Sequence, residues 1–314
     1  MVMFTRPPWS RYMMASPARY VGLENIIVDS TPGGHPEGSA VATTLAAAEA
    51  ALPSTGGVVV VKSGTYAGAT LAKGPSLWIF EPGCIINTTA LTVSGNKVGL
   101  DIGIGCDIQV AYTHSGDDGW LSMRNNADSD GLAFTGDRPY IDGGGLGTLH
   151  DGASTREGVL LDSCDDALIL NARVKTAGGG SNHEISVGSS LRAVLSHLQS
   201  VDAGSDAINI GTLSGDALVL GCNILDSDDE GVELNSPRGR VIGSHVAAVG
   251  SIGLRFFSNS DNGIAVGNVV EAATGDEADL AAGTANQVVV GNRISTVIDD
   301  DSGGTATVAG NDLS

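Results

Sequence analysis

The sequence predicts an all-β solenoid, a parallel β-helix, on three observations. Two short motifs recur every 19 to 27 residues along the second half of the chain. Glycine accounts for 45 of the 314 residues, which supplies many tight corners. Aromatic residues make up only 4%, so the core must be built from Val, Ile, Leu and Ala. A repeat of this length with no helical period is typical of stacked turns of short strands.

The first motif is a polar residue followed by a residue that is small in most copies and then by an apolar residue, any residue and a second apolar residue. The two apolar positions are expected to point inward and the residue between them outward, since side chains alternate along a strand. Equivalent residues of neighbouring turns then lie about 5 Å apart. The copies begin at Asp130, Glu157, His183, Asp206, Glu230 and Ile252.

The second motif is an apolar strand with an Asn or His at a nearly constant spacing. Such residues tolerate left-handed backbone geometry and bond neighbouring backbone groups, so they predict one side-chain ladder stacked at a turn. The residues of this column are Asn171, His197, Asn223, His245, Asn268, Asn292 and Asn311.

The front of the chain predicts a cap on the amino-terminal end of the solenoid. Residues 39–52 form an amphipathic helix that Ser39 can cap and that Pro53 ends. The run VVVVKSGTY at 58–66 then predicts a buried strand and a turn. Because the ends of a solenoid expose unpaired strand edges, this helix is expected to cover one of them.

The helix, the Gly56-Gly57 pair, VVVVKSGTY and SLWIFEPGCII (76–86) together resemble the entry of the pectate-lyase-like superfamily, which includes bacteriophage tailspikes. The resemblance covers about residues 28–90, with generic turns behind it. It implies a right-handed parallel β-helix over 28–314. It does not imply one chemistry, because lyases, hydrolases, epimerases and non-catalytic virion proteins share this fold. The phage relatives imply a homotrimer.

Residues 1–27 are predicted to form a docking arm. They are basic and aromatic, with no acidic residue before Glu24. The arm is expected to insert into an acidic partner, either another virion or surface protein or a neighbouring copy of this chain. The residues expected to dock are Phe4, Arg6, Trp9, Arg11 and Tyr12.

Composition excludes some classes of function. Lys and Arg number 16 against 36 Asp and Glu, and this net charge of −20 argues against a nucleic-acid partner. No apolar run approaches the 18 residues of a membrane span. The four cysteines contain no C-x-x-C pair and are expected to be buried free thiols.

Chemistry is expected on the outward positions of the first motif. A line of four polar side chains on adjacent turns stands out there, flanked by the polar residues that open each motif copy. The line consists of Ser186, Asn209, Glu233 and Arg255, and the flanking candidates are His183, Asp206, Asp229 and Glu230.

One interpretation of these residues is a glycoside hydrolase. Asp206 and Glu230 lie one turn apart, and such a carboxylate pair can act as acid and base. Two neighbouring acids repel, so one of them would keep a raised pKa. His183 can serve as a base on the same groove.

A second interpretation is a polysaccharide lyase. The stretch 209–268 resembles the chondroitinase B and alginate lyase family, which implies Ca²⁺ held by Asn209, Glu233 and Asp229, with Arg255 on the next turn. This sequence departs from that pattern, because the base position holds Arg238 instead of Lys. The Glu233 and Arg255 pair can equally be a simple cross-strand ion pair.

The third and preferred interpretation is a virion-associated, tailspike-like or surface-decoration protein that binds glycans. It places the chain on a virion or an extracellular surface. Few aromatic residues fall on the expected face, so Tyr112 and Trp120, in a predicted loop at 111–129, are the candidates for stacking on sugars. His114 is assigned to the same loop.

Overall fold

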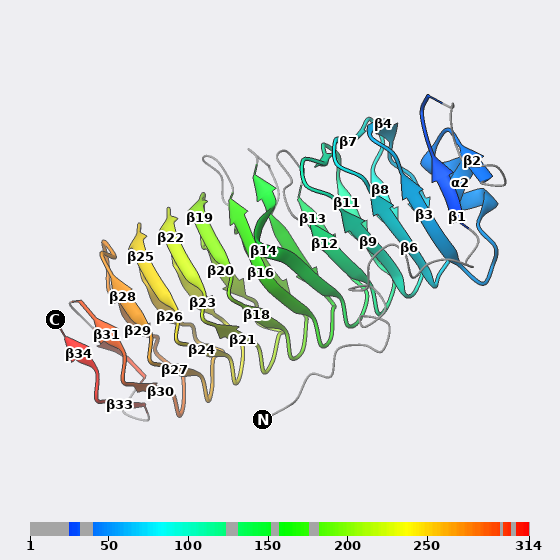
Figure 1. Ribbon diagram of the computed structural model, residues 1–314. Helices are drawn as coiled ribbons and strands as arrows, with labels where there is room; N and C mark the ends of the chain where they lie inside the picture. The colour runs from blue at the N-terminus through cyan, green and yellow to red at the C-terminus, as the bar shows by residue number, and fades with distance from the viewer. Residues whose placement is uncertain are drawn as a thin grey trace.

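The protein is a long rod of stacked turns, with the amino-terminal helix at one end and the last strands at the other (Figure 1). The computed structural model describes residues 25–31, 40–123, 131–151, 157–175, 182–295, 298–302 and 306–313. Strand pairs within these ranges are parallel, and they join elements about one turn apart in sequence. The architecture is the predicted all-β, right-handed parallel β-helix.

Three strand stacks run the length of the rod. The first face is an 11-stranded parallel sheet. Its strands are β5 (Thr70–Leu71), β8 (Leu91–Val93), β11 (Tyr112–His114), β13 (Leu132–Phe134), β15 (Val159–Asp162), β17 (Ile185–Gly188), β20 (Ile208–Ile210), β23 (Val232–Leu234), β26 (Leu254–Phe256), β29 (Ala278–Leu280) and β32 (Ile298–Asp300).

The second face follows the first in each turn. Its strands are β1 (Asn25–Val28), β2 (Ala40–Ala42), β3 (Gly57–Val61), β6 (Ser76–Phe80), β9 (Val98–Ile102), β12 (Trp120–Met123), β14 (Tyr140–Asp151), β16 (Leu168–Lys175), β18 (Val194–Ser196), β21 (Leu218–Leu220), β24 (Arg240–Ile242), β27 (Ile264–Val266), β30 (Val288–Val290) and β33 (Thr307–Ala309).

The third face completes the turn, and β14 and β16 continue into it from the second. Its remaining strands are β4 (Gly64–Ala67), β7 (Cys84–Asn87), β10 (Asp107–Ile108), β19 (Gln199–Ala203), β22 (Asn223–Ser227), β25 (His245–Val249), β28 (Val269–Glu271), β31 (Arg293–Ile294) and β34 (Asp312–Leu313).

The core lies between the three faces and is mostly aliphatic, as the composition predicts, with a few buried aromatic side chains that include Trp78 and Phe134. In β23, Val232 and Leu234 are buried while Glu233 between them faces outward, and the strands around it repeat this alternation. All four cysteines are buried free thiols, as predicted. Among the described residues, no helix is long and apolar enough to cross a membrane.

The cap helix is shorter than predicted. The described helix, α2, spans Leu45–Ala51, and Thr44 caps it by accepting a hydrogen bond from the Ala47 N–H at 3.1 Å. Residues 40–42, assigned to the helix in the sequence, form β2 and pair with β1. Ser39, the expected cap, lies outside the described residues. The helix begins after Thr44 because this residue has the extended backbone conformation that an N-cap requires.

We expect Thr44→Ala to lower the free energy of unfolding by about 1 kcal/mol, because it leaves the Ala47 amide without its acceptor. Urea denaturation followed by circular dichroism measures this difference. Thr43→Ala is the matched control, since Thr43 is exposed and one residue outside the cap. Equal losses in the two variants would contradict the assignment of Thr44.

The second motif is not one column, contrary to the sequence interpretation. Its residues fall on three consecutive positions of the turn between the second and third faces. Asn171 and His197 have positive φ angles, at the position that Gly221 occupies one turn later. Asn223 and His245 begin strands of the third face and are paired in register. Asn268, Asn292 and Asn311 alone form the predicted amide ladder.

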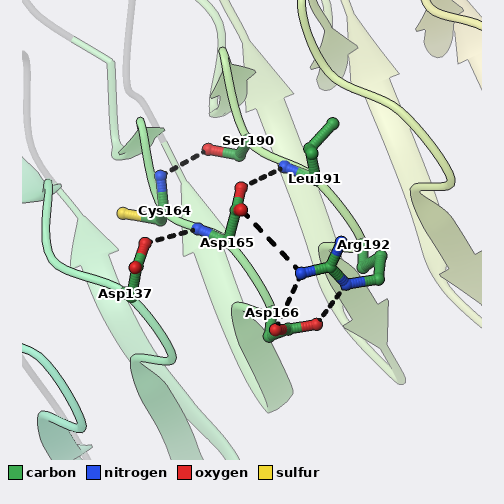
Figure 2. Close-up of polar contacts among 7 residues, drawn as sticks. All are labelled: Asp137, Cys164, Asp165, Asp166, Ser190, Leu191 and Arg192. Atoms are coloured by element: carbon green, nitrogen blue, oxygen red, sulfur yellow. Dashed lines mark hydrogen bonds and ion pairs between the residues drawn. The ribbon is translucent and has the colours of Figure 1, made fainter.

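A second ladder runs along the turn between the first and second faces (Figure 2). Asp137 accepts a hydrogen bond from the Asp165 N–H, and Asp165 accepts one from the Leu191 N–H. Beside them, Arg192 donates to Asp166 at 2.9 Å. The pairs Arg138–Asp118 and Arg238–Asp216 repeat this contact on other turns. We call these three Arg–Asp pairs the turn ladder.

Candidate functional site

The predicted line of polar residues exists on the outward side of the first face. Ser186, Asn209, Glu233 and Arg255 follow one another in register on β17, β20, β23 and β26. The line continues to Asp279 on β29. Parallel pairing fixes this spacing at about 4.8 Å, so neighbouring side chains can touch.

The polar residues that open each motif copy form a second line beside the first. Asp206 is its centre and is almost fully buried. One oxygen of its carboxylate, Oδ2, lies 3.1 Å from Nδ1 of His183 and accepts a hydrogen bond from Asn209 Nδ2 at 2.9 Å. Asn209 Nδ2 also lies 3.2 Å from Oε1 of Glu233. The two lines therefore form one connected cluster.

Arg255 closes this cluster at its carboxy-terminal side. Its Nη1 lies 2.6 Å from Oε1 of Glu230, and its Nε lies 3.4 Å from Oδ2 of Asp279. The guanidinium carbon lies 4.7 Å from the centre of the Phe257 ring. The expected pair with Glu233 is absent from the ion pairs of the described residues, since the long Arg255 side chain reaches diagonal neighbours instead.

The carboxyl groups of the cluster differ in their pKa values. Burial raises the pKa of Glu230 to about 8, and the neighbouring Asp206 carboxylate acts in the same direction. Burial also acts to raise the pKa of Asp206, but hydrogen bonds from His183 and Asn209 outweigh it and lower that pKa. Glu230 therefore holds its proton to a higher pH than Asp206 does.

The other titratable groups are shifted as well. Burial acts to lower the pKa of His183, but the Asp206 carboxylate outweighs it and raises that pKa. Burial raises the pKa of Glu233 and of Asp279. Groups with opposing shifts within one cluster are characteristic of acid and base catalysis.

The cluster differs from an ordinary structural ion-pair network in its charge balance. The turn ladder matches three Asp with three Arg at exposed positions. The cluster instead brings the carboxyl groups of Asp206, Glu230, Glu233 and Asp279 to one guanidinium and one imidazole. Asp206 and Glu230 are buried, and burying carboxyl groups costs stability.

The oxygen atoms of Asp206, Glu230 and Glu233 lie within 4.8 Å of one another, which is close enough to share a cation. Oxygen donors of this kind fit Ca²⁺. The expected ligand Asp229 is not in this group. It is exposed, and it directly precedes Glu230 in the chain. Glu230, which the sequence analysis assigned to the hydrolase pair, takes its place.

Three residues that the sequence analysis assigned to the site lie outside the cluster, namely Arg238, Tyr112 and Trp120. Arg238 belongs to the turn ladder, where its Nε lies 2.7 Å from Asp216, and it is not in the cluster. Tyr112 and His114 are not in a loop but are buried in β11, since their inward positions follow the strand alternation. Trp120 lies half-buried in β12, on the second face. Tyr112 therefore cannot stack on a sugar, and Trp120 lies away from the cluster.

Two residues of the site were missed in the sequence. Asp279 lies in Asp276-Glu-Ala-Asp-Leu280, a copy of the first motif in which Glu277 replaces the small residue. Phe257 directly follows the copy that contains Arg255. A search that ignored the small position would have found the turn that contains Asp279, whereas Phe257 lies just outside a copy that was recognised. The arm residues Phe4, Arg6, Trp9, Arg11 and Tyr12 lie outside the described residues.

The fold is a right-handed parallel β-helix, and the cluster lies on the outward side of its first face. No protein-family model matches the sequence, and no curated protein matches it. Solved structures do match its fold. The mannuronan C-5 epimerase AlgE4 A-module of Azotobacter vinelandii has a TM-score of 0.60 and 18% identity, covering 82% of this chain and 87% of that one.

Two further structures have the same architecture. A double mutant of the periplasmic alginate epimerase AlgG has a TM-score of 0.59 at 15% identity, covering 84% of this chain and 79% of that one. A polysaccharide lyase of family PL6 from Pseudopedobacter saltans has a TM-score of 0.50 at 8% identity, covering 82% and 88%. Identities this low show a common fold.

Proposed function

We propose that the protein is an enzyme that removes the proton next to a uronate carboxylate in a polysaccharide, as a lyase or an epimerase. The observation that carries this proposal is the outward cluster, where four carboxyl groups, two of them buried, meet one guanidinium and one imidazole and where Asp206 and Glu230 have divergent pKa values. The β-helix structures most similar to this chain include two alginate epimerases and a polysaccharide lyase, which supports the same class of substrate.

His183 is the proposed proton acceptor. Its Nδ1 faces the Asp206 carboxylate at 3.1 Å, an arrangement that favours a proton on Nδ1 and leaves the lone pair of Nε2 for the substrate. Asp206 thus acts as a positioning residue for the imidazole. The imidazole is one-quarter exposed, so it can reach a sugar ring lying on the face.

Arg255 is the proposed partner of the substrate carboxylate. A guanidinium stabilises the negative charge that develops on that carboxylate as the proton leaves. Because its pKa is raised to about 8, Glu230 neutralises Arg255 less than an ordinary carboxylate would. Ser186, Asn209 and Glu233 are placed in register to bond sugar hydroxyls. Ca²⁺, if bound by the three carboxylates, would add positive charge beside the uronate.

We expect His183→Ala and Arg255→Ala each to reduce turnover of uronate polysaccharides about 100-fold, since each removes a group that acts in the transition state. Product is followed as ultraviolet absorbance of unsaturated uronate for a lyase and as changed uronate stereochemistry by NMR for an epimerase. Arg238→Ala is the matched control, because its guanidinium is held by Asp216 on the turn ladder. Full activity in Arg255→Ala would contradict the assignment.

We expect activity to fall on the alkaline side with an apparent pKa of about 8, as Glu230 loses its proton and begins to neutralise Arg255. The pH dependence of kcat/KM measures this limb. Glu230→Gln keeps an uncharged side chain at this position, so the alkaline limb should disappear. Its persistence in Glu230→Gln would assign it to another group.

A glycoside hydrolase is the second candidate, favoured by the separated pKa values of Glu230 and Asp206. In that reaction, protonated Glu230 would act as the acid and ionised Asp206 as the second carboxylate. The same assay separates the reactions, because hydrolysis produces new reducing ends without ultraviolet absorbance. The preferred sequence interpretation, a trimeric virion or surface protein docked through residues 1–27, stays a prediction.

A further inference from the structure

The outward residues of the first face change from uncharged to charged along the rod. On the seven strands from β5 to β20 they are uncharged, and on the next four strands every one is charged. The first group is Thr70, Thr92, Thr113, Ala133, Leu160, Ser186 and Asn209. The second group is Glu233, Arg255, Asp279 and Asp299.

The uncharged part is long enough to bind a chain of sugars. Seven strands at the parallel spacing extend for about 29 Å. Two residues after Ser186 and Asn209, the next outward positions of these turns are Gly188 and Gly211. A Cβ added at either glycine would contact only Asp162 and backbone atoms of the β-helix. The glycines therefore leave the backbone accessible beside the cluster.

The charged part repels polyanions on balance. Asp279 and Asp299 are in register on β29 and β32, and Arg255 is the one cation among the described outward residues of this line. That cation is already engaged by Glu230 and Asp279. A chain with a carboxylate on every sugar would therefore bring one charge to Arg255 and leave the others without a partner along this line.

We infer that the substrate is a polysaccharide whose uronates are separated by uncharged sugars, extending from β5 along the uncharged line and past β20 to place one uronate at Arg255 on β26. This inference rests on the proposed function and names its substrate class. A net charge of −20 acts in the same direction, since it disfavours a uniformly anionic chain.

Alginate and the same alginate after partial esterification of its carboxylates test the inference, because esterification lowers the charge density while keeping the same sugar backbone. Binding is measured by calorimetry with the full-length His183→Ala variant, and kcat/KM with the unmodified protein. We expect esterification to lower the dissociation constant at least tenfold at low salt. Added salt should reduce the difference between the two dissociation constants, since it screens the repulsion between the carboxylates of alginate and the acidic face.

A gain-of-binding variant tests the same inference without relying on esterification. Ser186→Lys places a cation on the uncharged line, one strand from Asn209, and should strengthen binding of unmodified alginate several-fold. Gln199→Lys adds the same charge on the third face and is the control. Fluorescence anisotropy with labelled alginate oligosaccharides measures both variants.

The outcomes separate this inference from the proposed function. Tighter binding of esterified alginate without turnover of any chain would support the substrate class and refute the proposed reaction. Turnover with equal or better use of unmodified alginate would support the reaction and overturn the substrate class. Failure of both forms to bind, or equal gains from Ser186→Lys and Gln199→Lys, would also overturn the substrate class.

Discussion

Asn292→Ala is expected to lower the free energy of unfolding by about 4 kcal/mol, because it removes the middle of the buried amide ladder. The Asn292 side chain accepts hydrogen bonds from the N–H and Nδ2 of Asn268 and donates to the carbonyl of Ala265. Alanine leaves the Asn268 amide and the Ala265 carbonyl without these partners. Each orphaned buried group costs about 1–3 kcal/mol.

Guanidinium denaturation measures this loss, and hydrogen exchange at the Asn268 amide localises it. Asn259→Ala is the matched control, because Asn259 also bonds an Asn of the adjacent turn, Asn235, but at an exposed position. Its cost should stay within about 0.5 kcal/mol. A difference smaller than that between the two variants would show that the ladder does not stabilise the rod.

Acid is expected to destabilise the rod through His114. Burial lowers the pKa of His114 to about 4, from an ordinary value of 6.5. Between pH 6.5 and 4 the unfolded chain therefore binds a proton that the folded chain does not. Stability is fully present above pH 6.5 and falls as the pH drops, by about 3 kcal/mol in total.

The contrast between two variants isolates this effect. His114→Phe removes the titrating group, so its unfolding free energy should fall less steeply between pH 6.5 and 4. Tyr112→Phe removes only the hydroxyl that contacts His114 Nδ1 at 2.9 Å, and should keep the steep dependence, because burial causes the shift. Identical slopes in the two variants, measured by urea denaturation at several pH values, would contradict this account.

Most of the fold could be predicted because the repeat shows directly which positions face inward. The outward line from Ser186 to Arg255 follows from that spacing alone. The strand at 112–114 was not recognised, since its second inward position holds the polar His114 where the recognised copies have an apolar residue. The Asn column was misread because Asn suits a left-handed turn, a strand start and a buried ladder alike.

The site could be predicted in part, for a physical reason. Register alone makes Glu233 the neighbour of Arg255, whereas the actual partners, Glu230 and Asp279, depend on where a long side chain points. The opposite pKa shifts of Asp206 and Glu230 arise from burial and hydrogen bonds, neither of which a sequence displays. Spacing can bring candidate residues together, but it does not show which of them keeps its proton.

The parallel register makes the length of this protein independent of its chemistry. Each turn pairs only with the turns directly before and after it, and the cluster occupies the five turns that contain β17 to β29. Loss or duplication of a whole turn before β17 would move the amino-terminal cap by about 4.8 Å and leave the geometry of the cluster unchanged. In such an architecture, evolution can vary the length of the bound glycan one turn at a time while keeping the same reacting groups.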